Sequence, residues 1–134
     1  MSTPAVAFQS VTPNLVVRDV AASLAFYRDV LGFRITQTVP DQPPYAFVML
    51  ARDGVMVFLN DHGAAAKDLP MFATPQYGGT ATLFVIVDAV DVLHEAIAPH
   101  APVAMSLRTQ FYGMREFAVT DPDGHLITFA QRVG

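Results

Sequence analysis

The pattern of hydrophobic and polar positions in the first half of the chain predicts four strands and one amphipathic helix. β-branched and aromatic residues gather in four short stretches, at 11–17, 33–39, 45–51 and 55–60. Between the first two stretches, apolar residues recur at helical spacing on a face formed by Val20, Leu24, Tyr27 and Leu31. Asp19 suits the start of this helix and Gly32 suits its end. The predicted order is strand, helix and then three strands.

The second half of the chain repeats this order. A short helix is predicted at 89–98, which Asp88 would cap and Pro99 would end. Strands are predicted at 80–87, 103–107, 114–120 and 125–131. A shift of about 70 residues superposes the two halves without gaps. It places Thr12 on Thr82, Phe47 on Phe117, and Asp53-Gly54 on Asp123-Gly124.

The repeat predicts an α+β fold made of two βαβββ modules. Residues 1–134 would form one domain, with module 1 at about 9–61, a linker at 62–78 and module 2 at about 79–132. The linker is long for a connection, so we expect a lid or a segment that contacts a partner. Asp121-Pro122-Asp123-Gly124 predicts a tight turn, because proline presets φ and glycine accepts positive φ.

Composition narrows the classes of function. The chain is 52% hydrophobic and 15% charged, which indicates a large core or an apolar groove. The net charge is −4 without a basic patch, which argues against nucleic acid and favours neutral or cationic ligands. The absence of cysteine excludes disulfides, thiolate metal sites and cysteine nucleophiles. No membrane-spanning run or signal-peptide pattern is present, so we expect a cytoplasmic protein.

Two segments resemble the vicinal oxygen chelate superfamily, which includes glyoxalases, bleomycin-resistance proteins and extradiol dioxygenases. They are NLVVRDVAASLAFYRDVLGF, at 14–33, and GMREFAVTDPDGHLITF, at 113–129. Tyr112-Gly113 followed by Arg115-Glu116-Phe117 is most similar to the bleomycin-resistance branch, in which the aromatic residue before the glycine stacks on the drug. The resemblance implies paired modules whose curved sheets enclose a cavity, and it implies a homodimer.

Enzymes of this superfamily hold a divalent metal with histidine and glutamate side chains. The resemblance assigns those positions to Thr12, Phe58, Thr82 and Thr128, none of which is a strong ligand. We interpret the four histidines as surface or helix-cap residues, since no two have metal-ligand spacing on one face: His62, His94, His100 and His125. We therefore expect no metal and no other cofactor.

Alternation along the strands predicts which side chains line the cavity. If Thr128 faces inward, Met114, Glu116 and Ala118 face inward too, and Phe117 and Val119 face the helix. The repeat extends the inward set to Ala46, Val48, Leu50, Val16, Asn60, Ile86, Leu126 and Ala130. The candidate ligand-binding residues are Thr12, Asn14, Met56, Phe58, Thr82, Phe84, Tyr112, Met114, Glu116, Ala118 and Thr128.

Glu116 is the unusual member of this set. A carboxylate that faces an apolar cavity is costly unless it is solvated or paired. Its partner could be Arg18, Arg115 or a cation on the ligand, or it could be a solvated charge at the rim.

The pattern leaves several functions open. The first is a metal-independent small-molecule-binding protein of the bleomycin-resistance type, which sequesters a drug or metabolite in an apolar cavity. An alternative is a metal-free isomerase-like or lyase-like enzyme, with Glu116 or a tyrosine as acid or base. A metal-dependent glyoxalase-like or dioxygenase-like enzyme would need ligands that the sequence lacks, and a dimer without a ligand is the remaining possibility.

Overall fold

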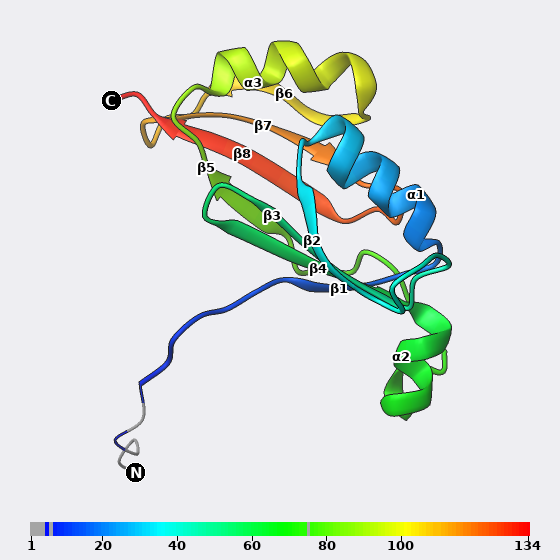
Figure 1. The fold of residues 1–134 in the computed structure, drawn as a ribbon. Helices are drawn as coiled ribbons and strands as arrows, with labels where there is room; N and C mark the ends of the chain where they lie inside the picture. The colour runs from blue at the N-terminus through cyan, green and yellow to red at the C-terminus, as the bar shows by residue number, and fades with distance from the viewer. Residues whose placement is uncertain (1–4, 6, 75) are drawn as a thin grey trace.

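The chain folds into two four-stranded sheets with the same strand order (Figure 1). The computed structural model describes residues 5, 7–74 and 76–134. Sheet 1 contains β1 (Asn14–Val17), β4 (Val55–Asp61), β3 (Phe47–Arg52) and β2 (Arg34–Val39), in that order. Sheet 2 contains β5 (Leu83–Ile86), β8 (Leu126–Arg132), β7 (Met114–Thr120) and β6 (Val103–Thr109). The predicted α+β fold with paired βαβββ modules is confirmed.

Each module carries its helix between its first two strands. α1 (Val20–Leu24) continues as a π-helical segment (Ala25–Val30), and α3 (Val90–Ile97) is followed by a 3₁₀ turn (Ala98–His100). Asp19 caps α1 as predicted, since its carboxylate accepts the backbone N–H of Ala21 at 3.0 Å. The predicted cap at Asp88 is wrong. The side-chain oxygen of Gln131, on β8, accepts the N–H of Val90 at 2.9 Å instead.

The linker between the sheets contains regular structure. α2 (His62–Asp68) is followed by a 3₁₀ turn (Pro70–Phe72), and Figure 1 shows α2 apart from the other two helices. His62 contacts the carbonyl of Phe72 and the hydroxyl of Tyr77, so the linker is closed on itself by polar contacts. Within the described residues no helix is both long enough and apolar enough to cross a membrane.

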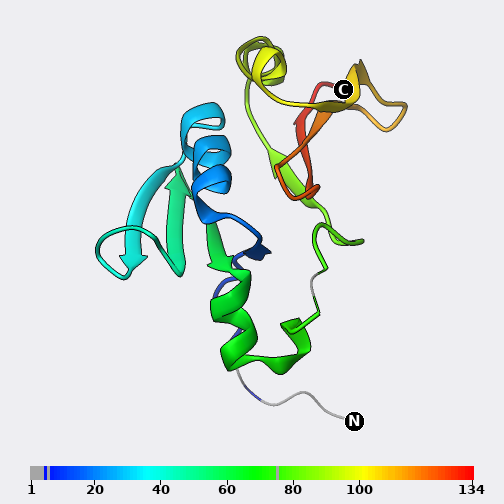
Figure 2. The ribbon, with the colours of Figure 1, turned by 90° about the vertical axis from the view of Figure 1, so that its right-hand side faces the viewer.

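One hydrophobic core joins the two modules. Val17, Tyr27 and Leu59 from module 1 belong to the same buried cluster as Phe117 and Ile127 from module 2. In Figure 2, α1 covers sheet 1 on the side where module 2 lies. The opposite face of each sheet, called the outer face below, therefore points away from the core. Large apolar side chains there are exposed: Met56 by 41%, Phe84 by 56% and Ile86 by 63%.

The outer face of β3 differs from the prediction. Met49 pairs with Phe58 and so shares its face, whereas Val48 and Leu50 are fully buried in the core. Val48 and Leu50 were predicted to line the cavity together with Ala46, which precedes β3; for Val48 and Leu50 the prediction is wrong.

The reason is the length of the hairpin loops. In module 2, Thr120 pairs with Leu126, so the loop between them has five residues. The corresponding pair in module 1, Ala51 with Met56, encloses one residue fewer. A shift of one residue moves every side chain of a strand to the other face. A gapless repeat therefore assigns β4 and β8 correctly but places β3 on the wrong face relative to β7.

Candidate ligand-binding site

The outer face of sheet 2 carries most of the candidate residues. Thr128 pairs with both Phe84 and Ala118, and Ala130 pairs with both Ile86 and Glu116. Paired residues of neighbouring strands share a face, so these side chains lie together as alternation predicted. Met114, Glu116 and Ala118 of β7, which share this face, are all buried. Thr82 precedes β5 and is exposed.

The outer face of sheet 1 is mainly apolar. Phe58 lies opposite Met49 on β3 and Asn14 on β1, and its ring packs edge-to-face against Phe47 with centroids 5.3 Å apart. The amide of Asn60 donates to the side-chain oxygen of Asn14, which makes one polar patch on this surface. Thr12 is half-buried and lies before the start of β1.

Within one protomer the candidates form two separate groups, one on each sheet. A groove of about 930 Å³ runs between the modules, but Tyr27, Leu31 and Ile97 from the helix-bearing sides line it. Met56, Thr82, Phe84 and Ile86 also line this groove, whereas Phe58, Tyr112 and Glu116 are not among its lining residues. The groove therefore shares the exposed apolar residues Met56, Phe84 and Ile86 with the outer faces, but it does not include the part of sheet 2 around Glu116.

Glu116 is buried at the outer face of sheet 2, with 4% of its surface exposed. Its Oε1 accepts the hydroxyl of Tyr112 at 2.6 Å and the side-chain amide of Gln110 at 3.1 Å. A turn in which Gly113 has φ of 85° and donates its N–H to the carbonyl of Gln110 brings Tyr112 back over β7. The hydrogen bond to Glu116 raises the pKa of the Tyr112 phenol.

Neither arginine that the sequence suggested is the partner of Glu116. The Nε of Arg18 lies 2.8 Å from Asp123, and the Nε of Arg115 lies 2.8 Å from Asp91 on α3. Burial also excludes a solvated charge at the rim. The Oε2 of Glu116 is buried and has no hydrogen-bond partner among the residues that the structure describes. Both protein-based interpretations of Glu116 are therefore wrong.

The Asp-Pro-Asp-Gly turn carries a buried polar network that sequence reasoning missed. The Oδ1 of Asp121 accepts the N–H groups of Asp123 and His125, at 2.9 and 2.8 Å. Its Oδ2 accepts the Tyr27 hydroxyl at 2.8 Å and lies 2.8 Å from Nδ1 of His125. An aspartate at the first turn position that bonds its own loop is a known turn signal, and it could have indicated the local part of this network.

These contacts shift the pKa values of Asp121, His125 and Tyr27. Burial alone would raise the pKa of the Asp121 carboxyl, but the hydrogen bonds from His125 and Tyr27 outweigh it and hold the pKa below its ordinary value. The hydrogen bond to Asp121 raises the pKa of His125 against the effect of burial. Burial, followed by the charge of Asp121, raises the pKa of Tyr27. The structure therefore favours an ionised Asp121 beside a protonated His125.

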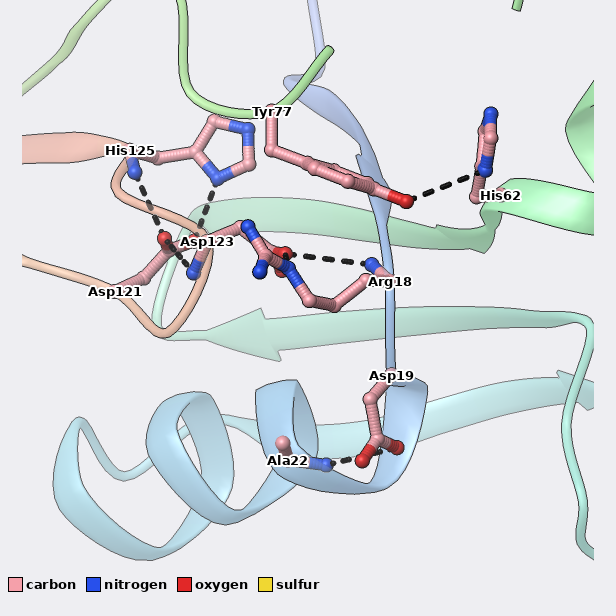
Figure 3. Close-up of polar contacts among 8 residues, drawn as sticks. All are labelled: Arg18, Asp19, Ala22, His62, Tyr77, Asp121, Asp123 and His125. Atoms are coloured by element: carbon pink, nitrogen blue, oxygen red, sulfur yellow. Dashed lines mark hydrogen bonds and ion pairs between the residues drawn. The ribbon is translucent and has the colours of Figure 1, made fainter. Parts of the chain in front are cut away.

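A second set of contacts joins the turn to the linker (Figure 3). The buried carboxylate of Asp123 accepts from Arg18, whose guanidinium lies 4.5 Å from the centre of the Tyr77 ring. The Tyr77 hydroxyl lies 3.2 Å from Nδ1 of His62. Module 1, the linker and the turn of module 2 thus meet in one cluster, which fixes the end of the linker.

Among the histidines, His125 differs from its interpretation as a surface or cap residue. His125 is buried against Asp121, and His94 packs edge-to-face on Phe117 with centroids 5.0 Å apart. His62 is the first residue of α2 and bonds within the linker. His100 is exposed, as expected.

The residues at the family's metal positions do not fit a divalent ion. The Phe58 ring packs on Phe47, and Thr128 lies between Phe84 and Ala118 in the sheet. Threonine hydroxyls are weak ligands and a phenyl ring is none. Across 7–74 and 76–134 there is no cluster of three or more histidine, cysteine, aspartate or glutamate side chains that could hold a metal.

Comparison with known proteins agrees with the paired-module fold. The sequence model of the Glyoxalase/Bleomycin resistance protein/Dioxygenase superfamily matches residues 8–129, and the chain belongs to this superfamily. It is 32% identical over 130 residues to the bleomycin resistance proteins of Geobacillus stearothermophilus and of Staphylococcus aureus strain N315, covering 90% of this chain and 95% of each relative.

Solved structures share the fold. TioX from Micromonospora sp. ML1 superposes with a TM-score of 0.74 at 23% identity, over 94% of this chain and 100% of that one. The bleomycin-binding protein of Streptomyces verticillus, solved with copper(II)-bleomycin, superposes with a TM-score of 0.63 at 23% identity, over 96% and 98%. At these identities the similarity establishes the fold alone.

Proposed function

We propose that this chain is a metal-independent binding protein of the bleomycin-resistance type, which sequesters a drug or metabolite. The observation that carries the proposal is the pair of apolar outer faces, with Phe84, Ile86 and Met56 exposed to solvent. Each square ångström of apolar surface that a ligand covers contributes roughly 25 cal/mol. The curated relatives at 32% identity, which are named bleomycin resistance proteins, support this class of ligand.

The binding cavity in this proposal is completed by a second copy of the chain. Within one protomer Met56, Phe84 and Ile86 line one groove. Phe58, Tyr112 and Glu116 do not line it, so one copy does not bring all the candidates around a ligand. In a homodimer, the outer face of sheet 1 from one copy would cover the outer face of sheet 2 from the other. The exposed apolar area on both faces supports this arrangement, because such patches mark interaction surfaces.

The ligand-binding residues in this proposal are the candidates of the two outer faces, with Tyr112 as the stacking platform. Tyr112 is 46% exposed, and its neighbour Phe111 lies edge-to-face beside it with centroids 5.1 Å apart. Aromatic side chains give large contact area at low entropic cost. The same face also holds Glu116, which would serve as the acid or base in a metal-free enzyme.

Drug tolerance and the fate of the drug test the proposal together. Cells that express the chain should tolerate bleomycin better than cells without it, and the drug recovered from the complex should have unchanged mass. Tyr112→Ala should weaken binding about tenfold. Met71→Ala is the control, because Met71 is an exposed apolar residue in the linker. Recovery of a drug with altered mass would favour the metal-free enzyme instead.

A further inference from the structure

We propose that Glu116 binds a cationic nitrogen of the ligand, such as an ammonium, amidinium or guanidinium group, through its Oε2. The inference rests on the proposed function, because it takes the outer face of sheet 2 as the ligand site. It adds the chemical class of the group that this face recognises.

The two carboxylate oxygens of Glu116 differ in their hydrogen bonds. Tyr112 and Gln110 both donate to Oε1, at 2.6 and 3.1 Å, and both donors are neutral. Oε2 is buried without a donor from any described residue. A buried carboxylate with one empty oxygen is costly, and charge-assisted hydrogen bonds are the interactions that offset this cost most. The site is therefore incomplete on one side of the carboxylate.

The nearby arginines of the protein do not form an ion pair with Glu116. Arg18 pairs with Asp123 and Arg115 pairs with Asp91. Arg108 lies opposite Glu116 in the pairing of β6 with β7, but its Nη2 points to the Met105 sulfur at 3.2 Å. Arg132 lies opposite Met114, and its guanidinium reaches the Gly113 turn. In the described part of the chain, no ion pair to Glu116 is formed.

The neighbours of the Glu116 carboxylate on the outer face are small or aromatic side chains. The strand register places Ala130 opposite Glu116, and Ala118 follows two residues later on the same face, so the neighbours of the carboxylate within the sheet are small. The ring of Tyr112 is held by its bond to Oε1 and remains partly exposed. A cation that reaches Oε2 would lie beside an aromatic ring, which adds a cation–π attraction. The preferred ligand therefore joins a flat apolar group to a cationic nitrogen.

Two probes of equal shape and different charge test this inference on the full chain. 2-Naphthylmethylammonium and the neutral 2-naphthylmethanol are titrated separately by calorimetry. The ammonium should bind about tenfold more tightly to the wild-type chain. Equal affinity, or no saturable binding of the ammonium at roughly 1 mM, would overturn the inference without any use of a variant.

Glu116→Gln should reduce the preference for the ammonium over the alcohol to less than about twofold. The matched control is Glu95→Gln, which removes the same charge from an exposed position on α3 and should retain the preference. Tyr112→Phe removes a donor to Oε1 and should also retain it. If Tyr112→Phe abolishes the preference as Glu116→Gln does, Glu116 acts by positioning Tyr112, and the inference is wrong.

The outcome is separable from that of the proposed function. Loss of bleomycin binding with a retained preference for the ammonium would reject the drug class and keep the cation site. Bleomycin binding without any preference for the ammonium would keep the drug class and reject the cation site.

Discussion

The β3–β4 loop and the β7–β8 loop both contain an Asp-Gly pair, but they have different roles. In module 1, Asp53-Gly54 is exposed, with Asp53 at φ of 52°, and it connects β3 to β4 without buried polar contacts of its aspartate. In module 2, Asp121 and Asp123 are buried and bonded to Tyr27 and Arg18 of module 1. The sequence repeat therefore preserves the Asp-Gly pair but not its contacts. Of the two loops, the one between β7 and β8 joins the modules through the side chains of its aspartates.

The outer faces differ for a related reason. The extra residue in the β7–β8 loop sets β7 one position out of step with β3. Sheet 1 consequently presents Phe47 and Met49 beside Phe58, whereas sheet 2 presents Glu116 and Ala118 beside Thr128. The result is one apolar face and one face with a single buried carboxylate, which suits a ligand that has both an apolar part and a cationic part.

The largest expected effect tests which face of β3 is buried. Leu50→Ala should destabilise the chain by about 2–5 kcal/mol, because Leu50 is fully buried and its truncation leaves a cavity. Met49→Ala, on the outer face of the same strand, should cost less than about 1 kcal/mol. Urea unfolding measures both. Equal losses would mean that the assigned register of β3 is incorrect.

The comparison of the two loops predicts a smaller difference. Asp121→Asn should destabilise by about 1–3 kcal/mol, since an amide nitrogen cannot accept from Tyr27 or His125 as the carboxylate does. Asp53→Asn should change stability by less than about 0.5 kcal/mol, because asparagine tolerates positive φ and the site is exposed. Thermal unfolding of the matched pair checks this, and a similar loss in both variants would contradict it.

The smallest expected effect is a dependence of stability on pH from the Asp121–His125 pair. The pKa of His125 is raised above 6.5, so its contribution is complete below that pH and is lost as pH rises through the folded value. The pKa of Asp121 is lowered below 3.8, so its contribution is complete above that pH and is lost as pH falls. Both contributions are therefore complete between about pH 4 and 6.5.

His125→Gln should flatten the decline in unfolding free energy as the pH rises above about 6.5. It should also weaken the acid limb, because the contacts of His125 help to hold the pKa of Asp121 down. His100→Gln is the control, since His100 is exposed and should leave the profile unchanged. An identical alkaline limb in wild type and His125→Gln would show that another group causes it.

The sequence predicted those features that depend on local pattern. The helical face Val20, Leu24, Tyr27 and Leu31 is buried as expected, and strand alternation put Glu116 and Thr128 on one face. These predictions succeeded because periodicity follows from backbone geometry alone.

The remaining features depend on side-chain partners that a periodic pattern does not specify. Gln131 replaces Asp88 at the start of α3, and Tyr112 with Gln110 replaces Arg18 or Arg115 at Glu116. Both sets of partners lie within module 2 and depend on where its turns and strand ends place the side chains, which periodicity does not encode. The single-residue difference in loop length is visible in the sequence only after the strand pairing is known.

We propose that the outer faces bind a ligand without a metal. Calorimetric titration of the purified chain with metal-free bleomycin in the presence of EDTA tests it most directly. We expect saturable binding that is unaffected when EDTA is replaced by added zinc, nickel, manganese or iron. The absence of binding in EDTA, with recovery of binding after one equivalent of metal is added, would contradict it.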